Sequence, residues 1–217
     1  MEWVLLGPLA EAERREVLAA ARRRRFARGE VVFHESDPGD TLHLIAKGHV
    51  AVRVATPLGD TALLAVLGRG QYFGELAVVS PAPRSATIVC LDEVETLALH
   101  RDAFEEVRAR HPAVDAVLTH ALVDEVRQLS SRLIEALYLP VECRVWRRVA
   151  ELTDLYGPAV KGSVVIPMTQ DDVAHLAGTT RPSANRVLRV GEARGAVRIG
   201  RGRIEVLDID AVARLAR

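Results

Sequence analysis

Residues 168–188 read MTQDDVAHLAGTTRPSANRVL, which contains two short helical patterns separated by a glycine. Thr169 precedes the first pattern and Thr180 precedes the second, and threonine is a favoured residue at a helix N-cap. Pro182 falls in the first turn of the second pattern, where a backbone N–H has no partner within the helix. Gly178 permits a sharp turn between the two. The stretch therefore predicts two short helices joined by a tight turn.

The second predicted helix carries polar side chains that suit DNA bases. Val187 and Leu188 anchor it inward, and Arg181, Asn185 and Arg186 lie on or near its exposed amino-terminal face. Arginine matches O6 and N7 of guanine with two hydrogen bonds, and asparagine matches adenine in the same way. A helix-turn-helix pushes the first residues of its second helix into the major groove. We therefore expect this helix to read DNA.

A basic hairpin follows the same motif. Residues 197–208, VRIGRGRIEVLD, form two β-rich runs around Gly200-Arg201-Gly202, which is typical of a wing that contacts phosphates. Residues 140–217 carry 13 Lys and Arg against 9 Asp and Glu, whereas residues 1–139 carry 16 against 20. Surface arginines on small helical pairs are common, but the caps, the wing and the charge of +4 together favour DNA binding. The candidate DNA-binding residues are Thr169, Gln170, Thr180, Arg181, Ser183, Asn185, Arg186 and Arg201.

A long helix is predicted upstream, over residues 113–139. Its apolar residues step by three or four positions, as in an amphipathic helix. The stripe could pack on a sheet of the same chain. However, a helix of about 25 residues is about 38 Å long at 1.5 Å per residue, which is longer than a domain of about 110 residues can cover. We therefore favour a seam between two parallel helices and expect a homodimer through residues 113–139. The stripe comprises Val117, Leu118, Leu122, Val126, Leu129, Leu133 and Leu137.

The amino-terminal half shows a different pattern. Residues 8–25 have helical spacing, and the arginine run at its end is either a solvated helix end, which we favour, or a nucleic-acid patch. From residue 29 to about residue 99, short alternating segments are separated by glycines at intervals of about ten residues. This spacing predicts an antiparallel sandwich or β-roll. Helices are expected again at 101–111 and, beyond Pro140, at 142–156, followed by a loop over 157–163 and a short strand.

Residues 73–87, FGELAVVSPAPRSAT, place an acid and a base near a glycine. Gly74 allows a close backbone approach, and the short helical turn after it, from Leu76, would offer free amides. Glu75 can accept hydrogen bonds from ribose hydroxyls, and Arg84 has the fork geometry for two phosphate oxygens. Ser85 adds a hydroxyl and Ala86 a low wall. A cyclic nucleotide requires this combination, although a surface salt bridge between Glu75 and Arg84 is an alternative.

The string F-G-E-L-A-x5-P-R-S-A-T resembles the phosphate-binding cassette of cyclic-nucleotide-binding domains, and the whole chain resembles the catabolite activator/FNR superfamily. The resemblance implies an α+β fold: a cyclic-nucleotide-binding β-roll (1–112), a long dimerisation helix and hinge (113–139), and a winged helix-turn-helix (140–217). It implies a homodimeric transcription regulator controlled by a cyclic nucleotide, cAMP first, and names double-stranded operator DNA and RNA polymerase as partners. The implied ligand residues are Gly74, Glu75, Leu76, Arg84, Ser85, Ala86, Leu129 and Ser130.

Two positions depart from the family pattern. Where cAMP-responsive members have a threonine-serine pair that reaches the adenine, this chain has Leu129 and Ser130. Leucine cannot donate to a purine edge, so cGMP, a cyclic dinucleotide or effector-independent DNA binding stay open. Pro182 replaces the base-reading glutamate of the recognition helix, so we expect a different operator sequence at that position.

Other functions have weaker support in the sequence. Hydrophobic residues make up 49% and charged residues 27%, a globular composition. The two cysteines and seven histidines show no metal-ligand spacing, no nucleophile motif is present, and no apolar run reaches membrane-span length. We expect a cytoplasmic protein without metal or cofactor. Two further hypotheses are a nucleotide sensor that acts through protein contacts, and an enzyme that uses Glu75 and Arg84 as an acid–base pair.

Overall fold

The structure is a computed structural model of the 217-residue chain. It describes residues 3–57, 59–80, 82–157 and 162–217. The chain folds into two compact units: Met1–Thr61 with Ala65–Gln128, and Ala62–Leu64 with Leu129–Arg217. Most of the loop predicted over 157–163 lies outside the described residues.

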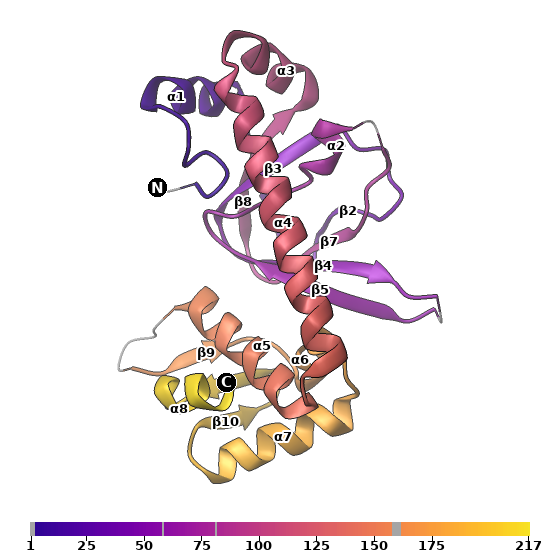
Figure 1. Ribbon diagram of the computed structural model, residues 1–217, viewed down its shortest axis with the longest axis vertical. Coiled ribbons are helices and arrows are strands. Elements are labelled where there is room, and N and C mark those ends of the chain that lie inside the picture. The colour runs from indigo at the N-terminus through magenta and orange to yellow at the C-terminus, as the bar shows by residue number, and fades with distance from the viewer. Residues whose placement is uncertain (1–2, 58, 81, 158–161) are drawn as a thin grey trace. The chain divides into compact units, whose positions relative to one another are not determined.

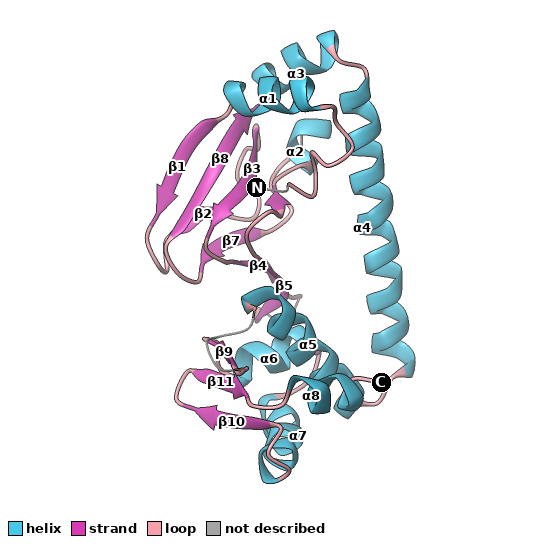
Figure 2. Cartoon of the chain, turned by 90° about the vertical axis from the view of Figure 1, so that its left-hand side faces the viewer, coloured by secondary structure: helices cyan, strands magenta, loops and turns pink. Residues whose placement is uncertain are grey.

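Two antiparallel sheets form the framework of the first unit (Figure 2). Their strands are β1 (Arg22–Phe26), β2 (Val31–Phe33), β3 (Thr41–Lys47), β4 (Val50–Ala55), β5 (Thr61–Leu67), β6 (Tyr72–Phe73), β7 (Thr87–Cys90) and β8 (Val94–His100). The strand order is β1-β8-β3-β6 in one sheet and β2-β7-β4-β5 in the other. Strands adjacent in space are therefore mostly distant in sequence. This is the antiparallel β-roll that the alternating segments predict.

Helices flank one end of the roll. They are α1 (Glu11–Ala20), α2 (Leu76–Val79), α3 (Arg101–Arg110) and the start of α4 (Ala113–Tyr138). Figure 1 shows α1 beside α3, and the carboxylate of Glu16 joins them by accepting from Arg110 at 2.7 Å and from His111 at 2.6 Å. The helices predicted at 101–111 and 113–139 are confirmed to within a residue. In the described parts of the chain no helix, α4 included, combines the length and apolar character that crossing a membrane requires.

Two apolar clusters fill the first unit. One gathers α1, α3 and the beginning of α4 onto β3 around the fully buried Phe104 and Leu99. The other lies between the sheets around Ile45, Val50 and Phe73. Burial of each large apolar side chain stabilises the fold by about 1.5–3 kcal/mol. The second cluster fixes β6, which leads directly into the Gly74 turn.

The arginine run at 22–25 is a strand, contrary to the helix predicted over 8–25. Helix α1 ends at Ala20, and β1 pairs with β8 with Phe26 opposite Val94. The side chain of Glu95 on β8 accepts from Arg23 at 2.6 Å and from Arg25 at 3.1 Å. Arginine favours helices, but pairing with a distant strand and burial of Phe26 decide the local structure here. The four arginines lie exposed on an edge strand of the sheet.

The second unit is a helical domain with a small sheet. Its elements are α5 (Val141–Tyr156), β9 (Val164–Ile166), α6 (Gln170–Leu176), α7 (Arg181–Ala193), β10 (Val197–Gly200), β11 (Arg203–Val206) and α8 (Ile209–Leu215), and the sheet order is β10-β11-β9 (Figure 2). The helix pair and the hairpin match the sequence prediction. Helix α8 was not predicted, although Asp208 caps it by accepting from the Ala211 amide at 2.8 Å.

Helix α5 carries the core of the second unit. Trp146 is 4% exposed and meets α7 at Gly191, where an added Cβ would lie 2.2 Å from the indole ring. A glycine is therefore required for α7 to approach this closely. On the opposite edge, Glu135 from the last turns of α4 accepts from Arg147 at 2.8 Å and from the buried Arg148 at 2.5 Å. These charge-assisted bonds hold the end of α4 against α5.

Candidate ligand-binding cassette and nucleic-acid interface

A glycine turn between β6 and α2 organises the cassette. Gly74 has a φ of +83°, which glycine adopts without strain. A Cβ at this position would lie 2.7 Å from the Arg84 Nη1 atom and 2.7 Å from the Thr41 carbonyl oxygen. The absent side chain therefore makes room for the guanidinium of Arg84. The chain returns to this turn at Arg84, ten residues after Gly74.

Arg84 is the most unusual charge of the first unit. Only 7% of the residue is exposed, and its Nη1 donates to the carbonyl oxygens of Thr41 at 2.9 Å and Gly74 at 3.3 Å. The guanidinium carbon lies 4.0 Å from the centroid of the Phe33 ring, within cation–π range. Its Nε is buried and has no hydrogen-bond partner among the described residues. Burial lowers the pKa of Arg84, while Asp40 and Glu75 oppose that shift. A buried donor without a partner suits an anionic ligand.

Glu75 supplies the acid of the cassette. Burial raises the pKa of its carboxyl group, Glu125 on α4 raises it further, and Arg84 lowers it. Burial and the nearby Glu75 also raise the pKa of Tyr72 to about 12. An ionised Glu75 is acceptor-only and fits hydroxyl donors such as those of a ribose. The structure thus brings together Gly74, Glu75 and Arg84.

The remaining predicted ligand residues differ in burial. Ser85 is exposed, Ala86 is buried and Leu76 is 44% exposed. Leu129 and Ser130 lie on α4 within the second unit, and both are exposed. The role of this pair in ligand binding stays a prediction.

An aromatic cluster supports Arg84 and was missed from the sequence. His43 stacks on Phe73 with ring centroids 4.9 Å apart, and Phe33 lies 5.8 Å from Phe73. His43 Nδ1 lies 3.1 Å from the Thr96 hydroxyl. Burial, followed by the nearby Arg84, lowers the pKa of His43 to about 3, so the ring is neutral at pH 7. Strand β3 is buried without a break from Leu42 to Ile45, so no alternation marks His43, and the rings around it belong to other strands and leave no local signal.

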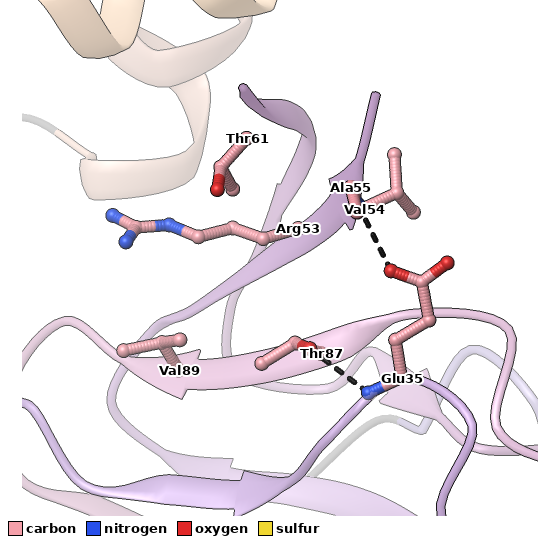
Figure 3. Close-up of a pocket in the computed structure, with 7 residues that line it drawn as sticks. All are labelled: Glu35, Arg53, Val54, Ala55, Thr61, Thr87 and Val89. Atoms are coloured by element: carbon pink, nitrogen blue, oxygen red, sulfur yellow. Dashed lines mark hydrogen bonds between the residues drawn. The ribbon is translucent and has the colours of Figure 1, made fainter. Parts of the chain in front are cut away.

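A cavity of about 240 Å³ lies elsewhere on the first unit (Figure 3). Its walls come from β4, β5, β7 and the segment after β2, and it shares Thr87, the last residue of the stretch 73–87, with the cassette. Glu35 spans it, since its amide donates to Thr87 Oγ1 and its carboxylate accepts from the Ala55 amide, both at 2.9 Å. Both contacts of Glu35 tie neighbouring strands together. The lining residues are Glu35, Arg53, Val54, Ala55, Thr61, Thr87 and Val89.

In the second unit, α6 and α7 form the predicted helix-turn-helix. Thr169 and Asp172 form a reciprocal capping box at the start of α6. Gly178 has a φ of +58° in the turn between the helices. Arg144 of α5 donates to the carbonyl oxygens of Ala177 at 2.8 Å and Gly178 at 3.1 Å, a brace that the sequence did not reveal. The turn is therefore fixed from both sides.

The predicted DNA-contacting side chains of α7 differ in exposure and in their hydrogen bonds. Arg181 and Arg186 are exposed, whereas Asn185 donates to Gln170 at 2.6 Å and so links α7 to α6. Thr180 occupies the N-cap, but its hydroxyl donates to Ser183 at 3.1 Å instead of accepting from a backbone amide. Two arginines therefore remain as the outward polar groups of the first two turns of α7.

The wing has the predicted place and charge. Strands β10 and β11 pair from Val197–Val206 to Gly200–Arg203 and turn through the exposed Arg201. Arg198 is held to Glu205 across the hairpin at 3.0 Å. Arg201 at the tip and Arg203 beside it are both exposed, so either could reach a phosphate.

Comparisons with known proteins match both units. A family model described as a cyclic nucleotide-binding domain matches residues 23–111, and one described as a Crp-like helix-turn-helix domain matches residues 132–215. The "CRP-like cAMP-activated global transcriptional regulator" of Mycobacterium tuberculosis is 30% identical over 88% of this chain and 87% of its own. The "Cyclic AMP receptor protein" of Thermus thermophilus is 31% identical over 91% and 89%. The c-di-GMP responsive global regulator CLP of Xanthomonas campestris, 19% identical, shares the fold with a TM-score of 0.76 over 91% and 99%.

Proposed function

This chain belongs to the CRP/FNR family of transcription regulators, and we propose that it is a homodimer whose binding to operator DNA is controlled by cAMP. It is not an enzyme: the relatives that match most of its length are regulators. The proposal assigns the ligand to 1–112, the dimer contact to 113–139 and the DNA to 140–217. A regulator of this kind acts in the cytoplasm.

The buried guanidinium of Arg84 is the observation that carries the ligand proposal. Burying a cation is costly unless an anion or hydrogen bonds offset the lost hydration. Arg84 has two carbonyl acceptors, and its Nε has none among the described residues. A cyclic phosphate would supply acceptors and a negative charge at once. Ser85, next to Arg84 and exposed, would add a hydroxyl donor.

Glu75 would bind the sugar. Its raised pKa means that burial and Glu125 disfavour the charged carboxylate. Hydrogen bonds from a ribose 2′-hydroxyl favour the charged form and would offset this cost. Leu76 and Ala86 would line the same site. A phosphate and a ribose hydroxyl are common to cAMP and cGMP, so the base must be distinguished elsewhere.

We assign base recognition to Leu129 and Ser130 on α4. Ser130 can donate to or accept from a purine, whereas Leu129 offers only apolar contact. Two relatives are named for cAMP, which supports cAMP as the effector. The Xanthomonas protein is named for c-di-GMP, so the fold also occurs with a different cyclic nucleotide. The alternative is cGMP or a cyclic dinucleotide bound through the same phosphate residues.

Val117 and Leu118 of the predicted stripe are buried in the core of the first unit, so it is the later, exposed apolar face of α4 that supports the dimer. These side chains repeat every three or four residues and have no cover within the described chain, which suits the same helix of a second copy. The exposed members are Val123, Val126, Leu129, Leu133, Ile134 and Leu137. Two copies of α7 could then read half-sites one DNA turn apart, about 34 Å. Contact with RNA polymerase would follow DNA binding.

Calorimetric titration of the full chain with cAMP and with cGMP tests the effector. We expect heat and saturation with cAMP and weaker binding of cGMP. A matched measurement of affinity for DNA selected from a random pool, with and without cAMP, tests the coupling, since a ligand acts only through its preference for one state. No heat with either nucleotide would overturn the effector, and a nucleotide recovered chemically altered would favour the enzyme hypothesis. Ligand binding without any sequence-specific DNA affinity would favour a sensor that acts through protein contacts.

A further inference from the structure

The first turn of α7 exposes one apolar side chain between two cations. Pro182 is exposed at the second helical position, and Arg181 and Arg186 are the exposed residues beside it on this face. Ser183 is engaged by Thr180 and Asn185 by Gln170. The surface that this turn would present to a base pair is therefore the proline ring, with a guanidinium on each side.

A proline ring can recognise only one feature of the major groove. It carries no side-chain donor or acceptor, and its backbone nitrogen has no hydrogen. Base edges in that groove offer hydrogen-bonding groups, apart from the C5-methyl group of thymine, which is apolar. Against guanine, cytosine or adenine the ring would cover polar groups without pairing them, which costs free energy. Against thymine it would bury a methyl group.

The neighbouring groups fix where this contact would occur. Gln170 holds Asn185, and Arg144 braces the turn before α7, so the first turn has a defined position in its unit. Arg181 precedes Pro182 directly, and Arg186 lies four residues after Pro182, on the same side of the helix. Each arginine suits a guanine. The methyl contact would thus fall within one or two base pairs of a guanine contact.

We propose that Pro182 is a specificity-determining residue that selects a 5-methylpyrimidine, normally thymine, in each operator half-site next to a guanine read by Arg181 or Arg186. This inference rests on the proposed function, because it requires that α7 enters the major groove. Pro182 would thus favour one base although its side chain has no hydrogen-bonding group.

The test removes single methyl groups from DNA. Operators are first selected from a random pool with the full chain and cAMP. Each thymine of a half-site is then replaced in turn by deoxyuridine, which lacks only the C5-methyl group. We expect one position at which binding weakens about fourfold, the effect of one buried methyl group. Substitution in both half-sites should weaken binding about 15-fold if the two contacts are independent. Cytosine and 5-methylcytosine at that position should show the same methyl dependence.

Protein variants assign the methyl effect to the ring. In Pro182→Ser, which replaces the ring with a polar side chain, the thymine-to-uracil ratio at the sensitive position should fall to about one. Pro182→Ala should retain part of it and serves if the serine variant does not fold. Val190→Ala, an exposed apolar change further along α7, is the matched control and should keep the wild-type ratio.

The possible results distinguish failure of the role of Pro182 from failure of the proposed function. Selected operators that tolerate deoxyuridine at every thymine would overturn the role of Pro182 and leave the proposed function intact. A methyl effect that persists in Pro182→Ser would assign it to another residue and overturn the inference as well. Failure to enrich any DNA sequence, with or without cAMP, would overturn the proposed function and this inference together.

Discussion

Arg84 and Arg186 are the same side chain in opposite settings. Arg84 is 7% exposed and holds its charge against two carbonyl oxygens and the Phe33 ring. The side chain of Arg186 is 72% exposed, and its nearest carboxylate, on Glu142, is 3.9 Å away. A buried cation suits a small anion that can be enclosed, because displacing water strengthens the interaction. An exposed cation suits a long polyanion, where release of counterions supplies affinity.

The two regions also differ in how firmly their charged side chains are held by neighbouring groups. Arg84 is held by carbonyl oxygens of Thr41 on β3 and of Gly74 after β6, and by the ring of Phe33. At the start of α7, hydrogen bonds of Arg144 and Asn185 hold the helix in its unit, while Arg181 and Arg186 are exposed. The first arrangement favours discrimination between small ligands. The second tolerates many DNA sequences and depends on a few base contacts for preference.

Removal of the buried charge should have the largest effect. Arg84→Leu should weaken cAMP binding at least about 100-fold, because it removes two charge-assisted hydrogen bonds to the phosphate. Calorimetry measures this loss. Arg28→Leu, which removes an exposed arginine of the same unit, is the control and should bind as the wild type does. Affinity of Arg84→Leu within about threefold of the wild type would place the phosphate elsewhere.

Removing an exposed charge should cost less and should depend on salt. Arg186→Ala should lose about 1–3 kcal/mol of affinity for the selected operator and relax its preference at one base. Arg201→Ala should instead weaken all sequences alike and reduce the salt slope by about one. Titration of labelled DNA at several salt concentrations distinguishes the two. Arg214→Ala on α8 is the control, and an equal loss in all three variants would contradict base recognition by Arg186.

A further prediction concerns the stability of the first unit. The pKa of His43 falls to about 3 in the folded protein, while the unfolded chain takes up this proton near pH 6.5. Stability therefore falls as the pH drops below about 6.5, by up to about 1.4 kcal/mol per pH unit. Urea unfolding of the wild type should show roughly 2 kcal/mol of this loss between pH 7 and pH 5. His43→Gln should lose that part of the pH dependence.

An exposed histidine provides the control for that measurement. His34→Gln removes a histidine from the same unit without entering the aromatic cluster, and its pH dependence should match that of the wild type. Equal slopes for His43→Gln and the wild type would show that burial of His43 does not contribute to acid sensitivity.

The sequence predicted those features whose signals are local. Thr169 with Asp172, Gly178 and the alternating strands each use residues close together in the chain, and the structure has a cap, a turn and strands at these places. The long helix was equally clear, because its apolar stripe persists over many turns. Gly74, Glu75 and Arg84 were predicted together from a short motif.

The misses have non-local causes. Arg22–Arg25 is a good helix-forming run, and only pairing with β8, 70 or more residues away, makes it a strand. Thr41 contributes a carbonyl oxygen to Arg84, and any residue type carries one. The hydrogen bond from Asn185 to Gln170 on the previous helix was also not predicted, while the base-reading role of Asn185 stays a prediction. In each case the deciding partner lies on another element, so periodicity and capping rules did not reveal it.

The strand formed by Arg22–Arg25 has a consequence for how the protein behaves at high concentration. An edge strand offers unpaired N–H and C=O groups that can recruit a strand from another molecule. Here such recruitment would bring the four arginines of one copy against the same four of the next. Repulsion between these charges disfavours such pairing, so the arginines of β1 protect the open edge of the sheet from fibrous self-association.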